Sequence, residues 1–320
     1  MLPFISARST RGGSFAAGPA APAVATAEVT RQSDLTAWWK CESVAEEIGG
    51  YDMTLANGGA FVDTVGGGPD GSTKAFKGDG TNDGMYSEPF DLGADDAISL
   101  CVWMRNPSNA NKYVSDTYGF VSLIRAADTS GDPDYTPSSG SLTGGRSYHS
   151  ALSFTLNQGS AQRMQVGGTF DTAGHNNMQV VKTYYHSGAG AATFDSPAIA
   201  PTAPAYDDAG SWKSEDWELW VVTWASGDKV KMYRGSALAQ TDFGTSGEYY
   251  DPPTLINQSA SDITDTLTVT SDVVLMAGSN LFTTSAANAS DNYFDDIRIY
   301  QVALSTSEIN EIYNAGAGDW

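Results

Sequence analysis

The sequence predicts an all-β protein: a two-sheet antiparallel jelly-roll sandwich with a short C-terminal helix and an extended N-terminal arm. Three observations support this. Apolar and polar residues alternate with the two-residue period of strands, turn-forming residues separate these stretches, and only one segment has helical periodicity. Hydrophobic residues make up 41% of the chain, which is enough for a substantial core.

The alternation is clearest in residues 98–105, 219–224 and 266–270, where two sets of side chains alternate along the chain. Further strands are predicted at 120–124, 151–156, 164–170, 178–185, 230–234, 273–277 and 294–300. Such a series of strands without intervening helices indicates two sheets packed face to face.

The single predicted helix follows Ser305. Ser305 can cap its first turn, and Glu308 stands three residues later, as in a capping box. Ile309, Ile312 and Tyr313 form one apolar stripe, and Gly316 is predicted to end the helix. A helix this short must dock on the sandwich to be stable.

Residues 1–33 are predicted to form an extended arm, and residues 34–320 the sandwich domain. The first block is rich in Gly, Ala and Pro and has no helix or strand period, so it cannot form a core by itself. We expect no signal peptide, because Gly and Pro interrupt the apolar run that one requires. The arm is either a floppy leader or a segment ordered against a neighbouring subunit. Its candidate contact residues are Phe4, Arg8 and Arg11.

Charge, hydropathy and cysteine spacing argue against nucleic-acid binding, membrane association and a paired-cysteine zinc site. The net charge of −21 disfavours nucleic acids and anionic lipid surfaces. No apolar run approaches the roughly 20 residues that span a bilayer. Cys41 and Cys101 fit no paired zinc spacing. We predict two buried free thiols, with a disulfide between them as the alternative.

Five segments, in chain order, carry a resemblance to a known family: 37–40, 74–86, 98–105, 217–235 and 294–309. The last contains the run FDDIRIY followed by ALS and EI, and it is the most specific. Together they resemble the laminin-G-like group of concanavalin A-like jelly rolls. The resemblance implies one concave and one convex sheet, and usually adhesion or glycan binding. Lys77, Arg234 and the long middle region 126–215 depart from the family pattern.

Residue patterns typical of catalysis are missing from the sequence. Glycosidases on this fold use Glu-x-Asp-x-x-Glu on one strand, which does not occur here. The nearest segment, Glu215 to Glu218, places its two glutamates on opposite strand faces and is interpreted as a solvated turn. The chain also has no Gly-x-Ser-x-Gly motif. We therefore predict that the protein is not an enzyme, with a glycoside hydrolase or lyase as the least favoured alternative.

Calcium is the best metal candidate. Asp295 has the same parity as the isoleucines of its strand, so its carboxylate should point to the apolar side of the sheet and need a cation or hydrogen-bond donors. The segment also resembles one in jelly-roll glucanases whose aspartate helps to hold a structural calcium. The alternative is a carboxylate satisfied by backbone N–H groups or Arg298. Asp79 and Asp83 form a second oxygen-rich turn, for which a plain hairpin turn is the alternative.

Aromatic residues in the middle region are candidates for glycan binding, because an aromatic face can pack against the C–H face of a sugar. Loops at the rim of a rigid sandwich commonly carry binding residues. The alternative is that these aromatics belong to the core or pack their own loops. The candidates are Tyr135, Tyr148, Tyr184, Tyr185, Tyr206 and Trp212.

Two functional hypotheses follow. The first is a virion-surface adhesion protein of head-decoration or fibre type, because residues 5–13 resemble the short Ser/Arg/Gly leaders of phage structural proteins. Its arm would contact other subunits, so that the protein is a homo-oligomer or part of a larger assembly, and its sandwich would bind a cell-surface glycan. The second is a secreted bacterial carbohydrate-binding module, which should lose residues 1–27.

Overall fold

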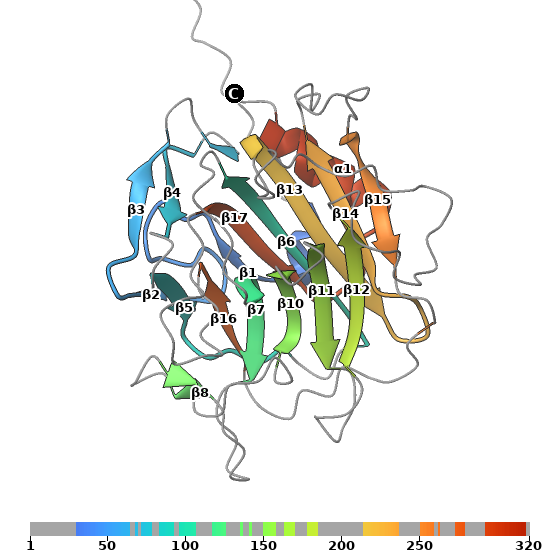
Figure 1. Ribbon diagram of the computed structural model, residues 1–320, viewed down its shortest axis with the longest axis horizontal. Helices are drawn as coiled ribbons and strands as arrows, with labels where there is room; N and C mark the ends of the chain where they lie inside the picture. Colours follow the sequence, from blue (N-terminus) through green and yellow to red (C-terminus); the bar gives the residue numbers. More distant parts are fainter. Residues whose placement is uncertain are drawn as a thin grey trace, which may run out of the picture.

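The computed structural model describes residues 30–64, 68–69, 72–78, 83–92, 96–106, 117–125, 135–136, 141–142, 150–157, 163–169, 178–184, 214–236, 250–258, 262, 273–278 and 292–317. These residues form two antiparallel sheets that lie one over the other, with one helix behind the larger sheet (Figure 1). The predicted fold class is confirmed. The arm residues Phe4, Arg8 and Arg11 lie outside the described residues.

The larger sheet, sheet A, has the order β15-β14-β13-β6-β17-β4-β3, and β1 also pairs with β17. All its pairings are antiparallel. Its strands are β1 (Leu35–Trp39), β3 (Ala60–Asp63), β4 (Lys74–Lys77), β6 (Ala97–Asn106), β13 (Ser214–Ala225), β14 (Lys231–Ser236), β15 (Tyr250–Gln258) and β17 (Tyr293–Tyr300).

The second sheet, sheet B, has the order β12-β11-β10-β7-β16-β5-β2. Its strands are β2 (Met53–Ala56), β5 (Gly84–Ser87), β7 (Thr117–Arg125), β10 (Ser150–Asn157), β11 (Arg163–Thr169), β12 (Met178–Tyr184) and β16 (Val273–Ala277). The remaining elements are the small β8–β9 pair (Tyr135–Thr136 and Ser141–Leu142), the 3₁₀ turn η1 (Gln32–Asp34) and the helix α1 (Thr306–Ala317).

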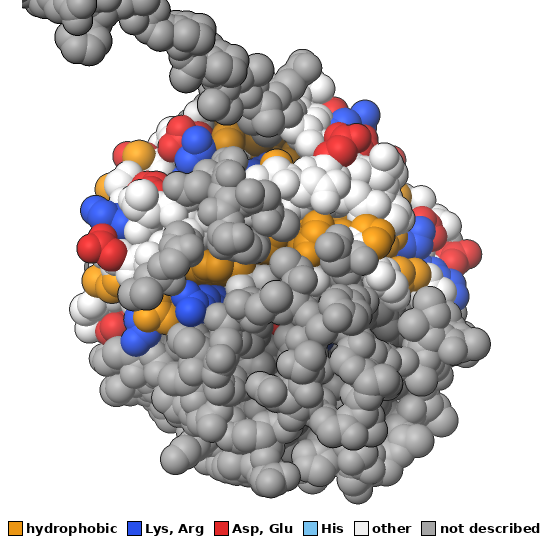
Figure 2. Space-filling view, turned by 90° about the horizontal axis from the view of Figure 1, so that it is seen from above, with side chains coloured by type: hydrophobic (Ala, Val, Ile, Leu, Met, Phe, Trp, Pro, Cys, Tyr) orange, Lys and Arg blue, Asp and Glu red, His pale blue; other side chains and the backbone are white. Residues whose placement is uncertain are grey.

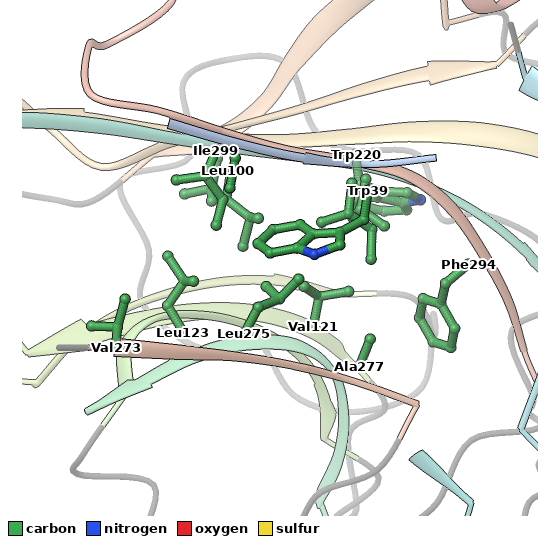
Figure 3. Packing of buried hydrophobic residues seen from close by; sticks show 14 of the residues in the cluster. Trp39, Leu100, Val121, Leu123, Trp220, Val273, Leu275, Ala277, Phe294 and Ile299 are labelled. Atoms are coloured by element: carbon green, nitrogen blue, oxygen red, sulfur yellow. The ribbon is translucent and has the colours of Figure 1, made fainter. Parts of the chain in front are cut away.

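The core between the sheets is built from the predicted alternation. Figure 3 shows Trp39, Leu100 and Trp220 of sheet A pointing towards Leu123 and Leu275 of sheet B. The even-numbered apolar residues of β6 all belong to this core. Burying two facing apolar surfaces is the main favourable term for a sandwich, at about 25 cal/mol for each Å² removed from water.

Sheet A is also buried on its outer face, which the sequence did not predict. The odd-numbered residues Cys101, Trp103 and Leu219 pack with Ile309 and Tyr313 of α1 in a second apolar cluster. The rings of Trp103 and Tyr313 stack with centroids 5.7 Å apart. The central strands β6 and β13 are therefore apolar on both faces, as expected where a helix covers a sheet.

The helix begins as predicted but does not end as predicted. The Ser305 N–H and hydroxyl both donate to Oε2 of Glu308 at 2.7 Å, which confirms the capping box. Partial burial would raise the pKa of Glu308, but these bonds and Arg31 lower it below its usual value. Gly316 was predicted to end the helix, which is wrong: α1 continues through Ala317. A Cβ at Gly316 would lie 2.5 Å from the Trp103 ring, so this glycine permits close contact with the sheet.

Strands β2, β3, β8, β9 and β15 were not predicted from the sequence. The predicted strand at 266–270 lies outside the described residues. Strands β2 and β3 were missed because they are short and only partly buried. Strand β15 was missed because it contains Pro252 and Pro253, which break a strand pattern but are tolerated at a sheet edge. Cys41 and Cys101 are free and buried, as predicted.

Replacing Gly316 with alanine is expected to destabilise the protein even though alanine favours helix. The added methyl group would overlap the Trp103 ring, and overpacking of this kind outweighs a helix-propensity gain of at most about 1 kcal/mol. We expect the free energy of unfolding to fall by about 1–2 kcal/mol, measured by urea denaturation. Asn314→Ala, at an exposed position of the same helix, is the control and should be neutral or slightly stabilising.

Candidate functional site

Several buried carboxylates in the described residues are held by internal hydrogen bonds. Glu46 is the fullest example: its two oxygens accept from the backbone N–H groups of Trp38, Ile48, Gly49 and Gly50. The bond from Trp38 links this carboxylate to the edge of β1, which would otherwise present an open N–H group. Glu46 therefore fixes the loop that follows β1.

The predicted solvated turn at 215–218 is wrong. These residues belong to β13, and Glu218 is fully buried on the inner face of sheet A. It forms an ion pair with Arg234 of β14, whose Nε lies 3.0 Å from Oε2, and it also accepts from the Trp220 indole at 3.1 Å. A carboxylate with a direct cation partner can be buried in a strand, which a single-strand pattern cannot reveal.

A second buried ion pair lies on the outer face of sheet A. Asp296 accepts from Nε and Nη2 of Arg298 at 2.7 and 2.8 Å and from the Trp38 indole. Arg298 Cζ and Lys40 Nζ lie 4.6 and 4.4 Å from the centre of the Trp38 ring. Both the carboxylate and the indole N–H are thus satisfied within the fold.

Asp295 is buried, as predicted, but not for the predicted reason. The ladder between β17 and β6 shifts register after Asp295, and Asp296 has a positive φ of 45°, so a bulge breaks the parity argument. Asp295 stands opposite Trp103 of the outer cluster, whereas Ile297 and Ile299 face the inner core.

Asp295 accepts from the Ser72 hydroxyl and, at 2.8 Å, from the backbone N–H of Asp296. Burial raises the pKa of its carboxyl well above the usual value, and the neighbouring charges of Asp296 and Glu42 raise it further, against the hydrogen bond from Ser72. Arg298, the alternative partner considered from the sequence, pairs with Asp296 instead. The surroundings of Asp295 therefore favour either the neutral form of its carboxyl group or a cation bound to it.

Among the described residues, no three His, Cys, Asp or Glu side chains gather in a group that could hold a metal ion. Asp83 is buried, and Asp79 lies outside the described residues. Calcium at Asp295, or at Asp79 and Asp83, stays a prediction.

The structure separates two of the predicted glycan-binding aromatics. Tyr135 lies in β8 and Tyr184 is the last residue of β12, and these strands lie on opposite sides of the molecule (Figure 1). The other four candidates lie outside the described residues; they are Tyr148, Tyr185, Tyr206 and Trp212. Trp212 comes only two residues before β13 begins.

A different aromatic site lies on the outer face of sheet A, and we call it the Tyr293 platform. It comprises Tyr293 of β17 with Lys77 of β4, Arg105 of β6 and Trp217 of β13. In the ladder, Tyr293 stands directly opposite both Lys77 and Arg105. The Trp217 ring meets the Tyr293 ring nearly edge-on, at a centroid distance of 6.4 Å and an angle of 79°.

Burial differs among the residues of the platform. Trp217 is buried, with 3% of its surface exposed, whereas Tyr293, Lys77 and Arg105 are half-buried and keep surface open to solvent. The buried indole thus supports a partly exposed phenol ring between two cations. Tyr293 was not predicted as a site residue, because the strand was predicted to begin at Phe294. The available signal was that Tyr293 has the opposite parity to the core residue Phe294.

The platform lies where β6 ends and β13 begins, at the upper end of sheet A in Figure 1. Figure 2 looks onto the molecule from above. Among the described residues, hydrophobic side chains form a band across the middle of this face, and charged side chains lie towards its edges. This arrangement fits a surface that combines apolar contact with charge.

No protein-family model matches the chain, and no curated protein matches it either. Solved structures similar to it include domain 4 of AbnA, an extracellular GH43 arabinanase from Geobacillus stearothermophilus, in complex with arabinotriose. This match has 12% identity and a TM-score of 0.45, and it covers 87% of this chain and 98% of that one.

Two toxin structures are also similar. The binding domain of Paraclostridial Mosquitocidal Protein 1 has 14% identity and a TM-score of 0.49, covering 88% of this chain and 52% of that one. Botulinum neurotoxin type C, whose cell entry depends on two ganglioside molecules, has 13% identity and a TM-score of 0.48, covering 88% and 51%. The chain thus spans about half the length of these toxin structures. The laminin-G-like resemblance stays a prediction. In the described part of the chain, no helix has the length and apolar character to cross a bilayer.

Replacing Asp295 with asparagine is expected to stabilise the protein increasingly as pH rises. The folded-state pKa of Asp295 lies above its usual 3.8, so the native state holds this proton more tightly than the unfolded state. The protonated Asp295 carboxyl contributes its full stabilisation below the pKa of the unfolded state. This stabilisation is lost as pH rises through the pKa of the folded state. Between these two pKa values, the free energy of unfolding of the variant should rise relative to that of the wild type by up to about 1.4 kcal/mol for each pH unit.

Thermal melts of both proteins from about pH 3 to about pH 8 would measure this difference. Asp63→Asn, at an exposed position, controls for removing one negative charge. Adding millimolar calcium to both proteins tests the alternative, in which Asp295 binds a cation. If it raises the melting temperature of the wild type near pH 7 and not that of Asp295→Asn, Asp295 holds a cation rather than a proton.

Proposed function

We propose that this protein is a non-catalytic adhesion module that binds a cell-surface glycan at the Tyr293 platform. The observation that carries the proposal is a partly exposed tyrosine ring with a buried tryptophan against it and a cation on each side. Sugars are recognised by packing their C–H face on an aromatic ring while polar groups bind their hydroxyls. The ring lies on strands rather than on a loop, which favours a pre-formed site.

The hydrogen bonds of the buried acids support a role without catalysis. A glycosidase needs two carboxylates that flank the scissile bond at a set separation. In the described part of the chain, Glu46, Glu218, Asp295 and Asp296 are each engaged by internal donors. Glu218 is tied up by Arg234 inside the sandwich, so it is not placed to act on a sugar at the outer face.

The proposed setting is a virion surface, with a secreted carbohydrate-binding module as the alternative. The proposal rests on the Ser-, Arg- and Gly-rich segment at 5–13. In the first setting, the arm (residues 1–33) would contact other subunits, and the mature protein would keep it. In the second, residues 1–27 would be removed. The intact mass of the protein isolated from its natural source distinguishes the two settings.

Loss of the Tyr293 ring should weaken glycan binding without unfolding the protein. In Tyr293→Ala we expect affinity to fall at least about tenfold, which corresponds to about 1.4 kcal/mol of lost stacking free energy. A glycan array identifies the sugars bound by the wild type, and titration calorimetry compares the variants on those sugars. Tyr86→Ala, a half-buried tyrosine on β5 of the other sheet, is the matched control and should bind like the wild type. A wild-type protein that binds no glycan, or an unaffected Tyr293→Ala variant, would contradict the proposal.

Deleting residues 1–29 should leave the sandwich folded but abolish assembly. The deletion must stop before Thr30, because Arg31 lies 3.2 Å from Glu308 of α1 and the Thr30 hydroxyl donates to Glu311. These contacts join the start of the domain to the helix. We expect an unchanged melting temperature and a smaller particle by light scattering. Unfolding of the truncated chain, or an unchanged particle size, would count against an assembly role for the arm.

A further inference from the structure

The turn between β2 and β3 contains the one Asn-Gly pair of the sequence, Asn57–Gly58. Because β2 belongs to sheet B and β3 to sheet A, the chain passes from one sheet to the other within residues 57–59 (Figure 1). Asn57 and Gly58 are both exposed, and both have a positive φ, of 58° and 115°. The Gly59 N–H closes the turn by donating to the Ala56 carbonyl at 3.1 Å. Positive φ at both central residues marks a type I′ turn, for which Asn-Gly is a preferred pair.

The same pair of residues is chemically reactive. The backbone nitrogen that follows an asparagine can attack the carbon of its side-chain amide, and glycine hinders this attack least because it has no Cβ. The hydrogen bond that closes the turn uses the N–H group of Gly59 rather than that of Gly58. Exposure of Asn57 and Gly58 gives water access to the product of the attack. The reaction therefore needs only these two residues and water.

We propose that the Asn57–Gly58 turn is a self-modification site at which Asn57 is converted to aspartate and isoaspartate. First, the Gly58 nitrogen forms a bond to Cγ of Asn57, the bond from Cγ to Nδ2 breaks, and Nδ2 leaves as ammonia with the proton of the Gly58 nitrogen. Water then adds to one carbonyl of the cyclic imide and breaks its bond to the nitrogen, which takes up a proton. Cleavage at Cγ gives aspartate in the normal backbone. Cleavage at the Asn57 carbonyl carbon gives isoaspartate, with the backbone routed through the side chain.

Isoaspartate adds one methylene carbon to the backbone of a turn that has little room to move. Gly59 is buried, and a Cβ there would lie 2.8 Å from the Phe76 ring and 3.0 Å from the Gly84 carbonyl oxygen. Phe76 belongs to the core between the sheets, and a Cβ at Gly278 would overlap the same ring. The longer turn must therefore displace either the core ring or β5. Conversion should loosen this connection between the sheets.

Conversion also changes the charge of the turn. Asp83 is buried beside it, and its Oδ1 would lie 3.3 Å from a Cβ at Gly58. Asn57 is neutral, whereas both products place a new carboxylate one residue from that contact. Like charges at short range repel each other, and solvent screens a buried charge only weakly. Both products should lower the stability of the protein, and isoaspartate should lower it more because it also lengthens the backbone.

The test incubates the full chain at mildly alkaline pH in heavy-oxygen water and then digests it with trypsin in ordinary water. Residues 41–74 form one tryptic peptide, in which Asn57 is the one asparagine. Residues 299–320 form the control peptide, which contains Asn310 and Asn314 of α1. We expect the first peptide to exchange amide for carboxyl at least about tenfold faster than the control, a barrier lower by about 1.4 kcal/mol. The product should carry one heavy oxygen and include a form that isoaspartyl methyltransferase labels.

Two variants separate the chemistry from its effect on stability. Asn57→Gly cannot form the imide, and glycine adopts a positive φ readily, so its melting temperature should stay constant during the incubation. That of the wild type should fall by at least about 2 °C over the same period. Freshly purified Asn57→Asp carries the new charge without the longer backbone, and it should melt between the fresh wild type and the isoaspartate fraction.

Each part of the inference has its own contrary result. An Asn57 that stays intact, or reacts no faster than the control peptide, would overturn the self-modification site. Complete conversion with a melting temperature as constant as that of Asn57→Gly would overturn the role of this turn in holding the two sheets together.

Discussion

Sheet A is buried on both of its faces, and this constraint organises the rest of the molecule. Its inner face packs on sheet B through Leu100 and Trp220, and its outer face packs under α1 through Trp103 and Leu219. Both faces of the central strands are covered, so a polar side chain on these strands is removed from solvent. Beyond the helix, Tyr293 and Arg105 of the outer face keep surface open to solvent. The Tyr293 platform begins at Arg105, two residues beyond Trp103 along β6.

Double burial also explains the buried ion pairs. Arg234 and Glu218 belong to adjacent strands on the inner face, and Asp296 and Arg298 lie on the outer face. A charge buried without a partner costs several kcal/mol, so each acid in these strands needs a cation or several donors. Glu46 meets the same requirement with backbone N–H groups alone. These buried acids of the described residues are thus engaged by hydrogen bonds and ion pairs within the fold.

Periodicity predicted the elements whose information lies within one segment. The alternation of 98–105 and the Ser305–Glu308 capping box are local patterns, and both are confirmed. Features that depend on a second strand were not predictable in this way. The bulge at Asp296 shifts parity by one residue, and Glu218 is buried because Arg234 lies on the next strand. The Tyr293 platform draws one residue from each of four strands, so no single segment contains its pattern.

If the Tyr293 platform binds a glycan as proposed, each copy of the protein would bind it weakly. One tyrosine ring and two cations offer a small contact area, and the cost of immobilising a ligand is largely independent of that area. The net charge of −21 would add repulsion from any anionic surface. Useful attachment would then require several platforms to act together, because linked sites gain affinity through effective concentration. An arm that assembles copies of this chain would supply that multiplicity. The arm and the platform would thus serve one adhesive function.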